Sequence, residues 1–330
     1  MTGILDRADE MKGGRALQNR IAEIPPAAWM LLILIVFYTV TVPGFLQGSN
    51  IITILIQAAP LLVLACGQTL VIMIQGTDLS VGSSISMTTV IWILLMQNGI
   101  PFAPAACIAV LVAVIGGAIG GFLVAVAHIP AFIATLGMQN IMSSIALTLS
   151  GNASIYQESQ WFGIITSGGI LFIPISVWIS VICFAATLFL LKRTGFGMKI
   201  VAIGGNSEAL VLAGGHNKKN VIQTFAFCGL MAGIAGLLIA CRIESGNPLA
   251  GESWEFNSIA AVLLGGTSMR GGKGGVVGTV YGVLLIQVLK SGLNQLGISS
   301  IYQNAIIGSV VLGAIILDAL IRKAQERRNG

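Results

Sequence analysis

Long apolar runs, separated by short polar or glycine-rich stretches, dominate the pattern of hydrophobic and polar positions along this chain. A helix needs about 20 apolar residues to cross the roughly 30 Å of hydrocarbon in a bilayer, and most of the runs approach that length. The pattern therefore predicts an all-α polytopic membrane protein with about ten transmembrane or partly spanning helices. The predicted segments are Ala27–Phe45, Ile51–Gln75, Val81–Met96, Pro104–Ala127, Pro130–Ser150, Pro174–Leu191, Val221–Cys241, Ser258–Thr267, Val276–Leu289 and Ile301–Ile321.

Two neighbouring runs, Ser258–Thr267 and Val276–Leu289, are too short to span a bilayer comfortably, and a glycine-rich turn separates them. We expect either broken helices or a re-entrant pair. Such backbone is tolerated at membrane depth only where protein or a water-filled cavity covers it. Whether residues 258–289 cross the membrane fully stays open at this point.

Composition and charge agree with a lipid environment. Hydrophobic residues make up 55% of the 330 positions and charged residues only 9%, whereas a soluble domain carries roughly 25% charged residues. The chain has no Lys or Arg from Ile21 to Leu191. It also has 42 glycines, and small residues allow close helix packing in membranes. Four of them form small-x-x-x-small pairs in the fourth segment, where we expect a packing surface: Gly116, Gly117, Gly120 and Gly121.

The basic residues predict the orientation. Four precede the first run, five lie between Lys192 and Lys219, and four follow Ile321. Since Lys and Arg favour cytoplasmic loops, we expect both termini inside. This gives a cytoplasmic N-terminal tail (1–24), a transmembrane domain (25–321) with an inward connection (192–220), and a cytoplasmic C-terminal tail (322–330). The net charge of +5 then reflects topology, and we expect no nucleic-acid partner.

Signatures of catalysis or metal binding do not appear in the sequence. The five cysteines fall in or at the ends of apolar runs without metal-ligand spacing, so we expect small buried hydrophobes. The histidines, His128 and His216, are isolated. No catalytic dyad or zinc motif is present, and we predict neither enzyme activity nor a cofactor or metal in this chain.

The first informative motif surrounds Asp78, in the stretch Gly76–Ser83 between two apolar runs. Asp78 is the only acid between Glu23 and Glu158. An ionisable group at membrane depth is a functional candidate. The alternative is a solvated inward turn in which Asp78 caps the next helix.

The second motif, Ala202–Gly215, places two glycines before Asn206 and two more after Ala213. Asn206 is a suitable N-cap, Glu208 lies in the first turn, and Gly214 is a suitable end. The motif predicts a short inward helix, which either docks into a partner's groove or merely connects two spans along the surface.

The third motif, Gly265–Gly275, superficially resembles a phosphate-binding loop. It fails that pattern because Gly274, and not Ser or Thr, follows Lys273 and no strand is predicted before it. A tight turn between two short helices is the better interpretation. Gly76-Thr77 and Gly266-Thr267 follow apolar runs in similar ways, which hints at repeated halves.

Taken in order, these motifs resemble the permease subunits of bacterial ribose- and other monosaccharide-type ATP-binding-cassette importers, and the resemblance extends over nearly the whole chain. The chain departs from the family pattern at Gln75, Thr77, His216 and Asn257. The matching stretches are Gln75–Gly82, Ala202–Ala209, Ile259–Ser268, Gly292–Gly297 and Leu317–Asp318.

The resemblance implies a multi-pass permease of the bacterial inner membrane that moves a monosaccharide, ribose-like or a hexose. It implies three partners: a separate ATPase subunit, a periplasmic sugar-binding protein and a second permease copy, identical or paralogous. The connection 192–220 is similar to the coupling loop of such permeases. The residues expected to couple to the ATPase are Asn206, Ser207, Glu208, Ala209 and Gly214. Those expected in translocation or gating are Asp78, Ser80, Gly82, Asn257, Gly266 and Thr267.

A secondary transporter or channel driven by an ion gradient is the competing interpretation. It would usually need buried ionisable residues for coupling, and only Asp78 is a candidate in the sequence. A membrane-embedded enzyme is disfavoured because no nucleophile–base or metal constellation is apparent.

Overall fold

The computed structural model describes residues 26–212 and 217–299, together with residues 302, 303, 305–310, 312, 313 and 316. The tails predicted at 1–24 and 322–330, Gly214 and His216 lie outside the described residues. The described chain is almost wholly helical, which confirms the all-α class; its only strands are four two-residue pieces.

The helices are α2 (Pro26–Thr41), α3 (Gly48–Met73), α4 (Val81–Gln97), α5 (Phe102–Ala125), α6 (Ala131–Ser150), α7 (Gln160–Thr166), α8 (Ile175–Arg193), α9 (Gly195–Leu212), α10 (Asn217–Ile243), α11 (Trp254–Leu264) and α12 (Val276–Gln295). The strands are β1 (Ile155–Tyr156), β2 (Gly169–Ile170), β3 (Ile173–Pro174) and β4 (Ser245–Gly246).

Within the described residues, six helices are long and apolar enough to cross a membrane: α3, α5, α6, α8, α10 and α12. Three shorter apolar helices accompany them: α2, α4 and α11. Together these nine correspond to the first nine predicted segments, while the tenth, Ile301–Ile321, is largely outside the described part. The prediction that Val276–Leu289 is too short to span a bilayer comfortably was wrong, because the helix α12 continues to Gln295 and reaches 20 residues. Only α11, with 11 residues, remains short.

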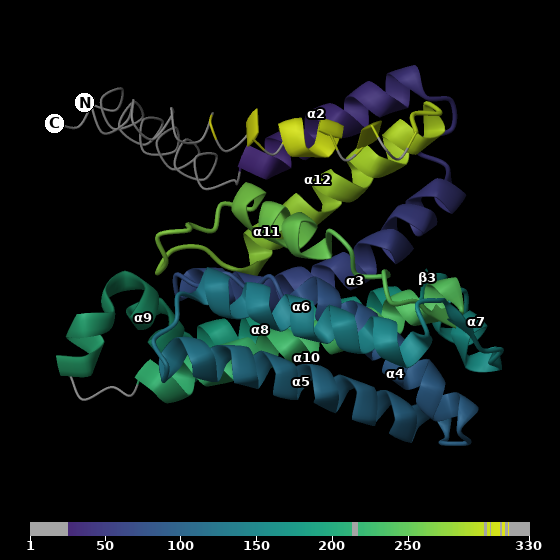
Figure 1. Ribbon diagram of the computed structural model, residues 1–330. Helices are drawn as coiled ribbons and strands as arrows, with labels where there is room; N and C mark the ends of the chain where they lie inside the picture. The colour runs from purple at the N-terminus through teal and green to yellow at the C-terminus, as the bar shows by residue number, and fades with distance from the viewer. Residues whose placement is uncertain are drawn as a thin grey trace, which may run out of the picture.

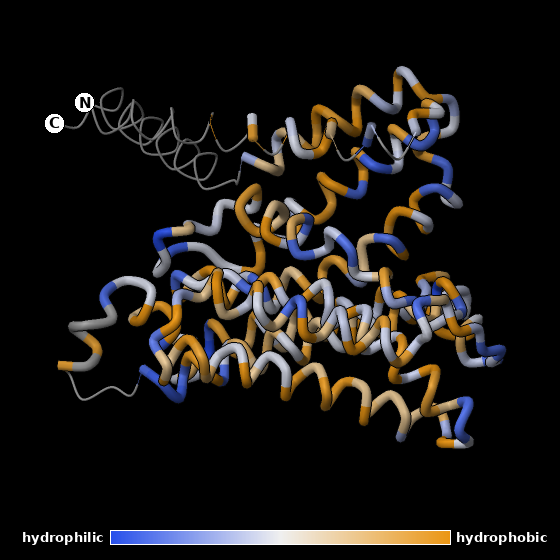
Figure 2. The backbone as a smooth tube through the Cα atoms, viewed as in Figure 1, coloured by the Kyte–Doolittle hydropathy of each residue, from blue (hydrophilic) through white to orange (hydrophobic). Residues whose placement is uncertain are grey.

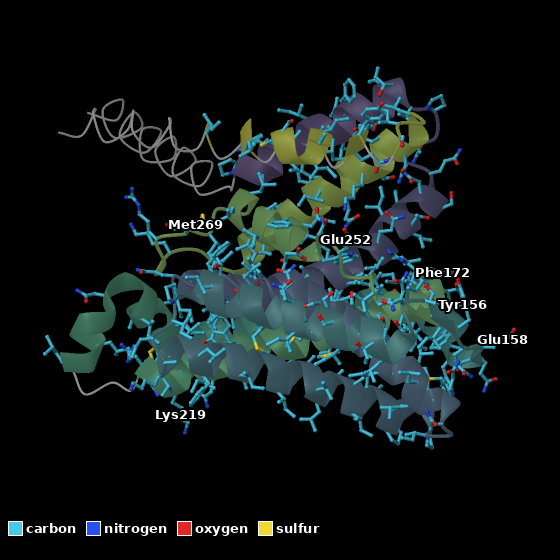
Figure 3. All side chains as sticks on the ribbon, viewed as in Figure 1. Tyr156, Glu158, Phe172, Lys219, Glu252 and Met269 are labelled. Carbon is cyan, nitrogen blue, oxygen red and sulfur yellow. The ribbon has the colours of Figure 1, made fainter. Side chains whose placement is uncertain are left out.

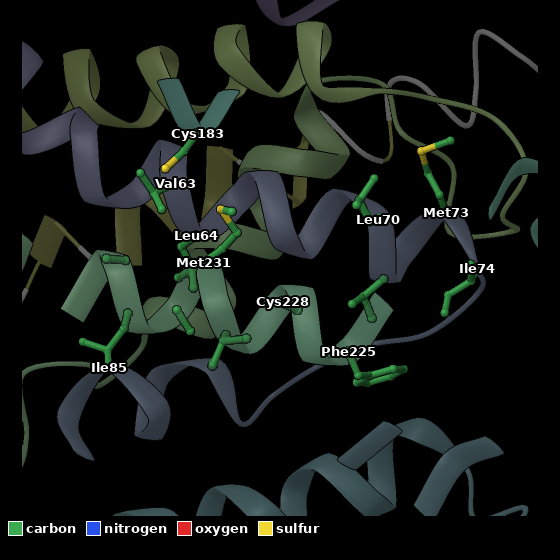
Figure 4. Packing of buried hydrophobic residues seen from close by; sticks show 14 of the residues in the cluster. Val63, Leu64, Leu70, Met73, Ile74, Ile85, Cys183, Phe225, Cys228 and Met231 are labelled. Atoms are coloured by element: carbon green, nitrogen blue, oxygen red, sulfur yellow. The ribbon is translucent and has the colours of Figure 1, made fainter. Parts of the chain in front are cut away.

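The helices run roughly alongside one another in two groups that share α3 (Figure 1). In one group α10 packs most extensively against α5, α3 and α4; in the other, α12 packs against α11, α2 and α3. The first group encloses the largest apolar cluster, in which Leu64, Leu70, Phe225 and Met231 interdigitate (Figure 4). Hydrophobic positions line the lengths of the helices and polar ones gather near their ends (Figure 2).

Glycines bring α5 and α10 into close contact, as the small-residue pattern predicted. A Cβ on Gly117 would overlap the carbonyl oxygen of Phe225, and one on Gly229 would overlap that of Ala113. Four of the five cysteines are buried, as expected. Cys107 is instead exposed on the outer face of α5.

The two ends of the bundle are named here by the helices that mark them, the α7 end and the α9 end (Figure 1). At the α7 end β1 pairs with β4, with Ile155 opposite Gly246, so two loops far apart in sequence are joined. Trp92 contacts Phe102 and Phe162 edge to face beside this pair, with ring centroids 4.9 and 5.6 Å away. The long connections after α6 and after α10 therefore meet in one ordered cap.

At the α9 end, the connection predicted as a loop with one short helix is helical almost throughout. α9 begins at Gly195 and interrupts its helical geometry only at Asn206, whose backbone is extended (φ −158°, ψ 98°). This conformation is typical of a residue at an N-cap, so the predicted helix start at Asn206 agrees with the structure. The side chains of Ser207, Glu208 and Ala209 lie outside the described part.

Candidate functional site

The span that returns after α3, residues 74–97, is interrupted because its first part, near the α9 end, is not helical. α3 stops at Met73, and the small, polar residues that follow lead back into the bundle before α4 starts at Val81. Asp78 Oδ1 accepts hydrogen bonds from Ser80 N (2.9 Å) and Ser80 Oγ (2.6 Å). In this Asx-type turn the carboxylate accepts the Ser80 N–H, which has no carbonyl partner from a preceding helical turn just before α4 begins. The positive end of the α4 dipole further stabilises a negative charge there.

Asp78 is only 1% exposed. The alternative of a solvated inward turn is therefore wrong, although the side chain does lie at the start of a helix. A carboxylate buried at this depth is costly unless hydrogen bonds satisfy it. Both bonds from Ser80 serve that purpose, and they form within the local sequence Asp78-Leu79-Ser80.

A second interrupted span, residues 244–264, crosses the first. After β4 the chain runs without helix to Ser253, and α11 then continues towards the α9 end (Figure 1). Where the two spans cross, the backbones of Gly251 and Gly82 touch: a Cβ on Gly251 would overlap the carbonyl oxygen of Gly82. Gly251 N donates a 2.9 Å hydrogen bond to Ser86 Oγ. Glycine is required on both sides because no side chain fits between the backbones.

Glu255, in the first turn of α11, places its carboxylate against this crossing point. Its Oε1 accepts a 3.4 Å hydrogen bond from Gln139 Nε2 of α6. Its Oε2 is buried without a hydrogen-bond partner, and a Cβ on Gly82 would overlap that atom. The Glu255 side chain is 4% exposed. The crossing point thus holds two buried carboxylates, those of Asp78 and Glu255, near the start of one helix.

The crossing point lies deep within the bundle. Gly82 precedes the last residue of α4, Gln97, by fifteen positions, and a rise of 1.5 Å per residue puts it about 22 Å from the α7 end. Since the hydrocarbon core is about 30 Å thick, this group lies at membrane depth.

The structure brings together only some of the predicted translocation residues. Asp78, Ser80 and Gly82 meet at the start of α4, whereas Gly266 and Thr267 lie in the turn after α11. Thr267 Oγ1 accepts a 3.3 Å hydrogen bond from Gly275 N, which closes that turn, as the sequence predicted for the Gly265–Gly275 stretch. Asn257 donates a 2.9 Å hydrogen bond to Ser253 O, one helical turn back in its own element.

Sequence reasoning missed three members of the site: Glu255, Gln139 and Gly251. Residues 242–257 connect the predicted segments Val221–Cys241 and Ser258–Thr267, and the orientation predicted from the Lys and Arg residues places this connection outside the membrane as a loop. The one available signal was the position of Glu255, directly before the apolar run of α11.

Gln75 ties three segments together at the α9 end. Its Nε2 donates 2.9 Å hydrogen bonds to Gly204 O in α9 and to Arg270 O in the turn between α11 and α12. Beside it, Gly272 N donates a 2.9 Å bond to Met73 O at the end of α3. Gln75 itself has a left-handed backbone (φ 63°). Movement of α9 would therefore reach both interrupted spans directly.

Comparisons with known proteins agree with this architecture. The family described as "Branched-chain amino acid transport system / permease component" matches residues 50–320. The ribose import permease protein of Haemophilus influenzae is 38% identical over 277 residues, covering 83% of this chain and 86% of that protein. The ribose import permease protein of Escherichia coli K12 is 38% identical over 280 residues, with the same two coverages.

The D-allose transport system permease protein of Escherichia coli K12 is 34% identical over 275 residues, covering 83% of this chain and 84% of that protein. No solved structure matches the chain significantly.

Proposed function

Because the chain belongs to the family of branched-chain amino acid transport system permease components, we propose that it is the membrane permease subunit of an ATP-binding-cassette importer for a monosaccharide. The observation that carries the substrate class is the 38% identity, over 83% of the chain, to ribose import permeases. The D-allose permease at 34% supports a sugar of similar size. The similar proteins are permeases, so ATP hydrolysis belongs to a separate subunit.

The proposed assembly contains this chain, a second permease copy, an ATPase pair and a periplasmic sugar-binding protein, in a bacterial inner membrane. The α9 end faces the cytoplasm and the α7 end faces outward. Basic residues support this orientation, since Lys192, Arg193, Lys199, Lys218 and Lys219 all lie at or near the α9 end. The transmembrane permease domain is assigned to residues 25–321, with cytoplasmic tails on both sides.

In this assembly the coupling segment lies within residues 192–220 and includes Asn206, Ser207, Glu208, Ala209 and Gly214. The break at Asn206 turns the second half of α9 away from the first. The first half is anchored, because Gly204 packs against Met73 O and its carbonyl accepts the Gln75 bond. An ATPase pushing on the second half would thus move the end of α3 and the turn before α12 together.

Gln75→Gly tests this coupling. Glycine keeps the left-handed backbone while deleting both hydrogen bonds, each contributing about 0.5–1.5 kcal/mol. We expect the sugar transported per ATP hydrolysed to fall roughly fivefold, as a loss of about 1 kcal/mol would produce, with normal amounts of permease in the membrane. The measurement is parallel sugar uptake and ATP hydrolysis in vesicles that contain the whole importer.

The matched control is Gln97→Ala. Gln97 also donates one side-chain bond to a backbone carbonyl, Tyr156 O at 3.1 Å, but at the α7 end. Its removal should leave the ratio of sugar to ATP unchanged. An unchanged ratio in Gln75→Gly as well would contradict a coupling role for the three-segment contact.

The competing function is a secondary transporter driven by an ion gradient. One observation favours it: Asp78 and Glu255 are both buried at membrane depth, and such transporters use buried acids to bind their coupling ion. Asp78, however, already has two hydrogen bonds from Ser80, so Glu255 Oε2 is the one acid oxygen there without a partner among the described residues.

Reconstitution separates the two functions. In liposomes we expect sugar uptake only when the ATPase subunit, ATP and the sugar-binding protein are all present, with a hydrolysis-deficient ATPase as the control. The ATPase should bind inside-out membrane vesicles and not right-side-out ones, because the α9 end is exposed only in the former. Uptake by the chain alone, driven by a proton or sodium gradient, would establish the competing function and end the importer proposal.

A further inference from the structure

A cavity of about 290 Å³ opens at the α9 end of the bundle. The connection between α3 and α4, the end of α5, the connection between α5 and α6, and the first turns of α10 all contribute to its wall. Phe225 is fully buried and lies one helical turn deeper than Val221, so the cavity reaches into the bundle. The lining is mostly apolar, and its polar side chains are those of Gln75 and His128. We call this space the His128 cavity.

His128 lies at the surface of this cavity in an ordered turn. Its backbone is left-handed (φ 57°), and Ile129 N donates a 3.2 Å hydrogen bond to Leu123 O, which closes the connection between α5 and α6. The His128 side chain is exposed. Gln75 Nε2 already has two carbonyl partners. The imidazole of His128 is therefore the side chain of the lining that remains available to a polar ligand.

The cavity lies where the lipid-facing surface of the bundle meets the cytoplasmic end. Its wall includes Val124 of α5 and Ala131 of α6, and both helices are long and apolar enough to cross a membrane. Exposed aromatic side chains accompany them on the same two helices, Phe122 at 51% and Phe132 at 57% exposure. Large apolar side chains exposed on a spanning helix contact acyl chains, so lipid reaches the neighbourhood of the cavity.

Two lysines flank the cavity from α10. α5 and α10 are antiparallel here, and a Cβ on Gly121 would come within 2.9 Å of Ile222 Cα. One turn closer to the α9 end, Lys218 and Lys219 therefore lie level with the end of α5 and the His128 turn. Both lysines are exposed, and Figure 3 shows Lys219 at the α9 end on the side of α5.

Among the described residues, no acidic side chain balances these two charges. Asp78 is buried at the crossing point. The other described acids lie at the α7 end or on the interrupted span 244–264: Glu158, Glu244, Glu252 and Glu255. The mouth of the His128 cavity thus combines two unbalanced cations and an imidazole with an apolar interior, which is suited to an anionic, amphipathic ligand.

We propose that the His128 cavity binds an anionic phospholipid of the cytoplasmic leaflet. The head-group phosphate accepts hydrogen bonds from Lys218, Lys219 and the His128 imidazole, and the glycerol and the start of an acyl chain enter the apolar interior. Basic pockets between helices at the cytoplasmic side of a membrane favour such head groups. The inference uses the orientation given with the proposed function and does not depend on the sugar transported.

A lipid in this cavity would act on the first interrupted span. Ile74, Gln75 and Gly76 belong to the lining, and Gln75 joins α9 to the turn between α11 and α12. A filled cavity holds this connection against α5 and α10. The importer should therefore transport sugar faster in a membrane that contains anionic lipid, because the bound lipid supports the contact through which α9 acts.

Lipid retention tests the binding site. The whole importer is purified with phosphatidylglycerol, and the lipid that stays bound to the permease is counted by native mass spectrometry. Lys218→Gln/Lys219→Gln should weaken retention roughly tenfold or more, since each lysine near an anionic lipid contributes about a fivefold change in affinity. The matched control is Lys192→Gln/Arg193→Gln, an exposed cationic pair at the end of α8 that does not flank the cavity. Equal retention in the two variants would overturn the proposal.

Filling the cavity tests its interior without changing charge. Val221→Trp should reduce retention of phosphatidylglycerol, whereas Val181→Trp, on an exposed position of α8, should not. Glycerol 3-phosphate supplies the same phosphate chemistry without acyl chains and should not displace the lipid. Full displacement by glycerol 3-phosphate would assign the site to a soluble phosphate ester. Loss of ATPase binding by Val221→Trp in lipid-free detergent would assign the cavity to the ATPase subunit, and either result would overturn the lipid proposal.

Transport separates failure of this inference from failure of the proposed function. Uptake is compared in vesicles of phosphatidylcholine alone and in vesicles with about one third phosphatidylglycerol. We expect the anionic lipid to raise uptake by the wild-type importer at least threefold, and to have little effect on Lys218→Gln/Lys219→Gln. If both respond equally while uptake still requires the ATPase, this inference is wrong and the importer function stands. If uptake needs no ATPase, the importer function itself is wrong.

Discussion

Gly251→Ala should sharply reduce the amount of folded permease in the membrane. The added methyl group would overlap the backbone carbonyl of Gly82 and would also lie 3.0 Å from Ile85 Cβ. Backbone cannot move aside as a flexible side chain can, and overpacking costs about 1–3 kcal/mol or more. Separation of the two interrupted spans would also break the bond from Gly251 N to Ser86 Oγ, adding about 0.5–1.5 kcal/mol.

The measurement is the amount of permease in the membrane together with the thermal midpoint of the detergent-purified protein. A matched control is Gly163→Ala in α7, where a Cβ meets nothing within 4 Å. That change should be neutral or slightly stabilising, because alanine favours a helix by about 1 kcal/mol over glycine. Equal midpoints for the two variants would mean that the interrupted spans do not cross at Gly251 and Gly82.

Asp78→Ala should lower sugar uptake per permease by at least tenfold, and Asp78→Asn by less. Alanine leaves Ser80 N and Ser80 Oγ, both buried, without their acceptor, at about 1–3 kcal/mol for each orphaned group. Asparagine restores an acceptor oxygen but not the charge, and a charge-assisted hydrogen bond is roughly twice as strong as a neutral one. The start of α4 would lose its position, and with it the contacts of Gly82 with Gly251 and Glu255.

Sugar uptake and thermal midpoints are measured for both variants to check that Asp78→Ala is the more damaging. Ser80→Ala and the double variant Asp78→Ala/Ser80→Ala complete a double-mutant cycle. The double variant should lose less stability than the sum of the single ones, because the two side chains share one interaction. Wild-type uptake by Asp78→Ala would show that the carboxylate does not hold the start of α4. Abolished uptake in Asp78→Asn at an unchanged midpoint would instead show that the charge itself is needed.

Several features of this protein follow from its sequence alone, because they depend on short stretches of chain. The length of each apolar run predicts a membrane helix wherever lipid is the solvent, and nine of the predicted segments correspond to helices in the structure. The break before Val81 follows from the mostly small or polar residues Gly76–Ser80, in which the Asp78 carboxylate accepts a hydrogen bond from the backbone N–H two positions on. The break at Asn206 follows likewise from an N-cap residue after two glycines. The motif order also carried the family resemblance, which the match over residues 50–320 agrees with.

Only the tertiary structure decided how these pieces meet. The contacts of Gly251 with Gly82, Glu255 with Gln139, and Gln75 with Gly204 and Arg270 join residues more than a hundred positions apart, and no local pattern specifies them. The polar stretch after α10 was interpreted as an outward loop. Composition cannot show whether water or protein surrounds a non-helical backbone. Hydropathy likewise gives the length of α6 but not the surroundings of each face.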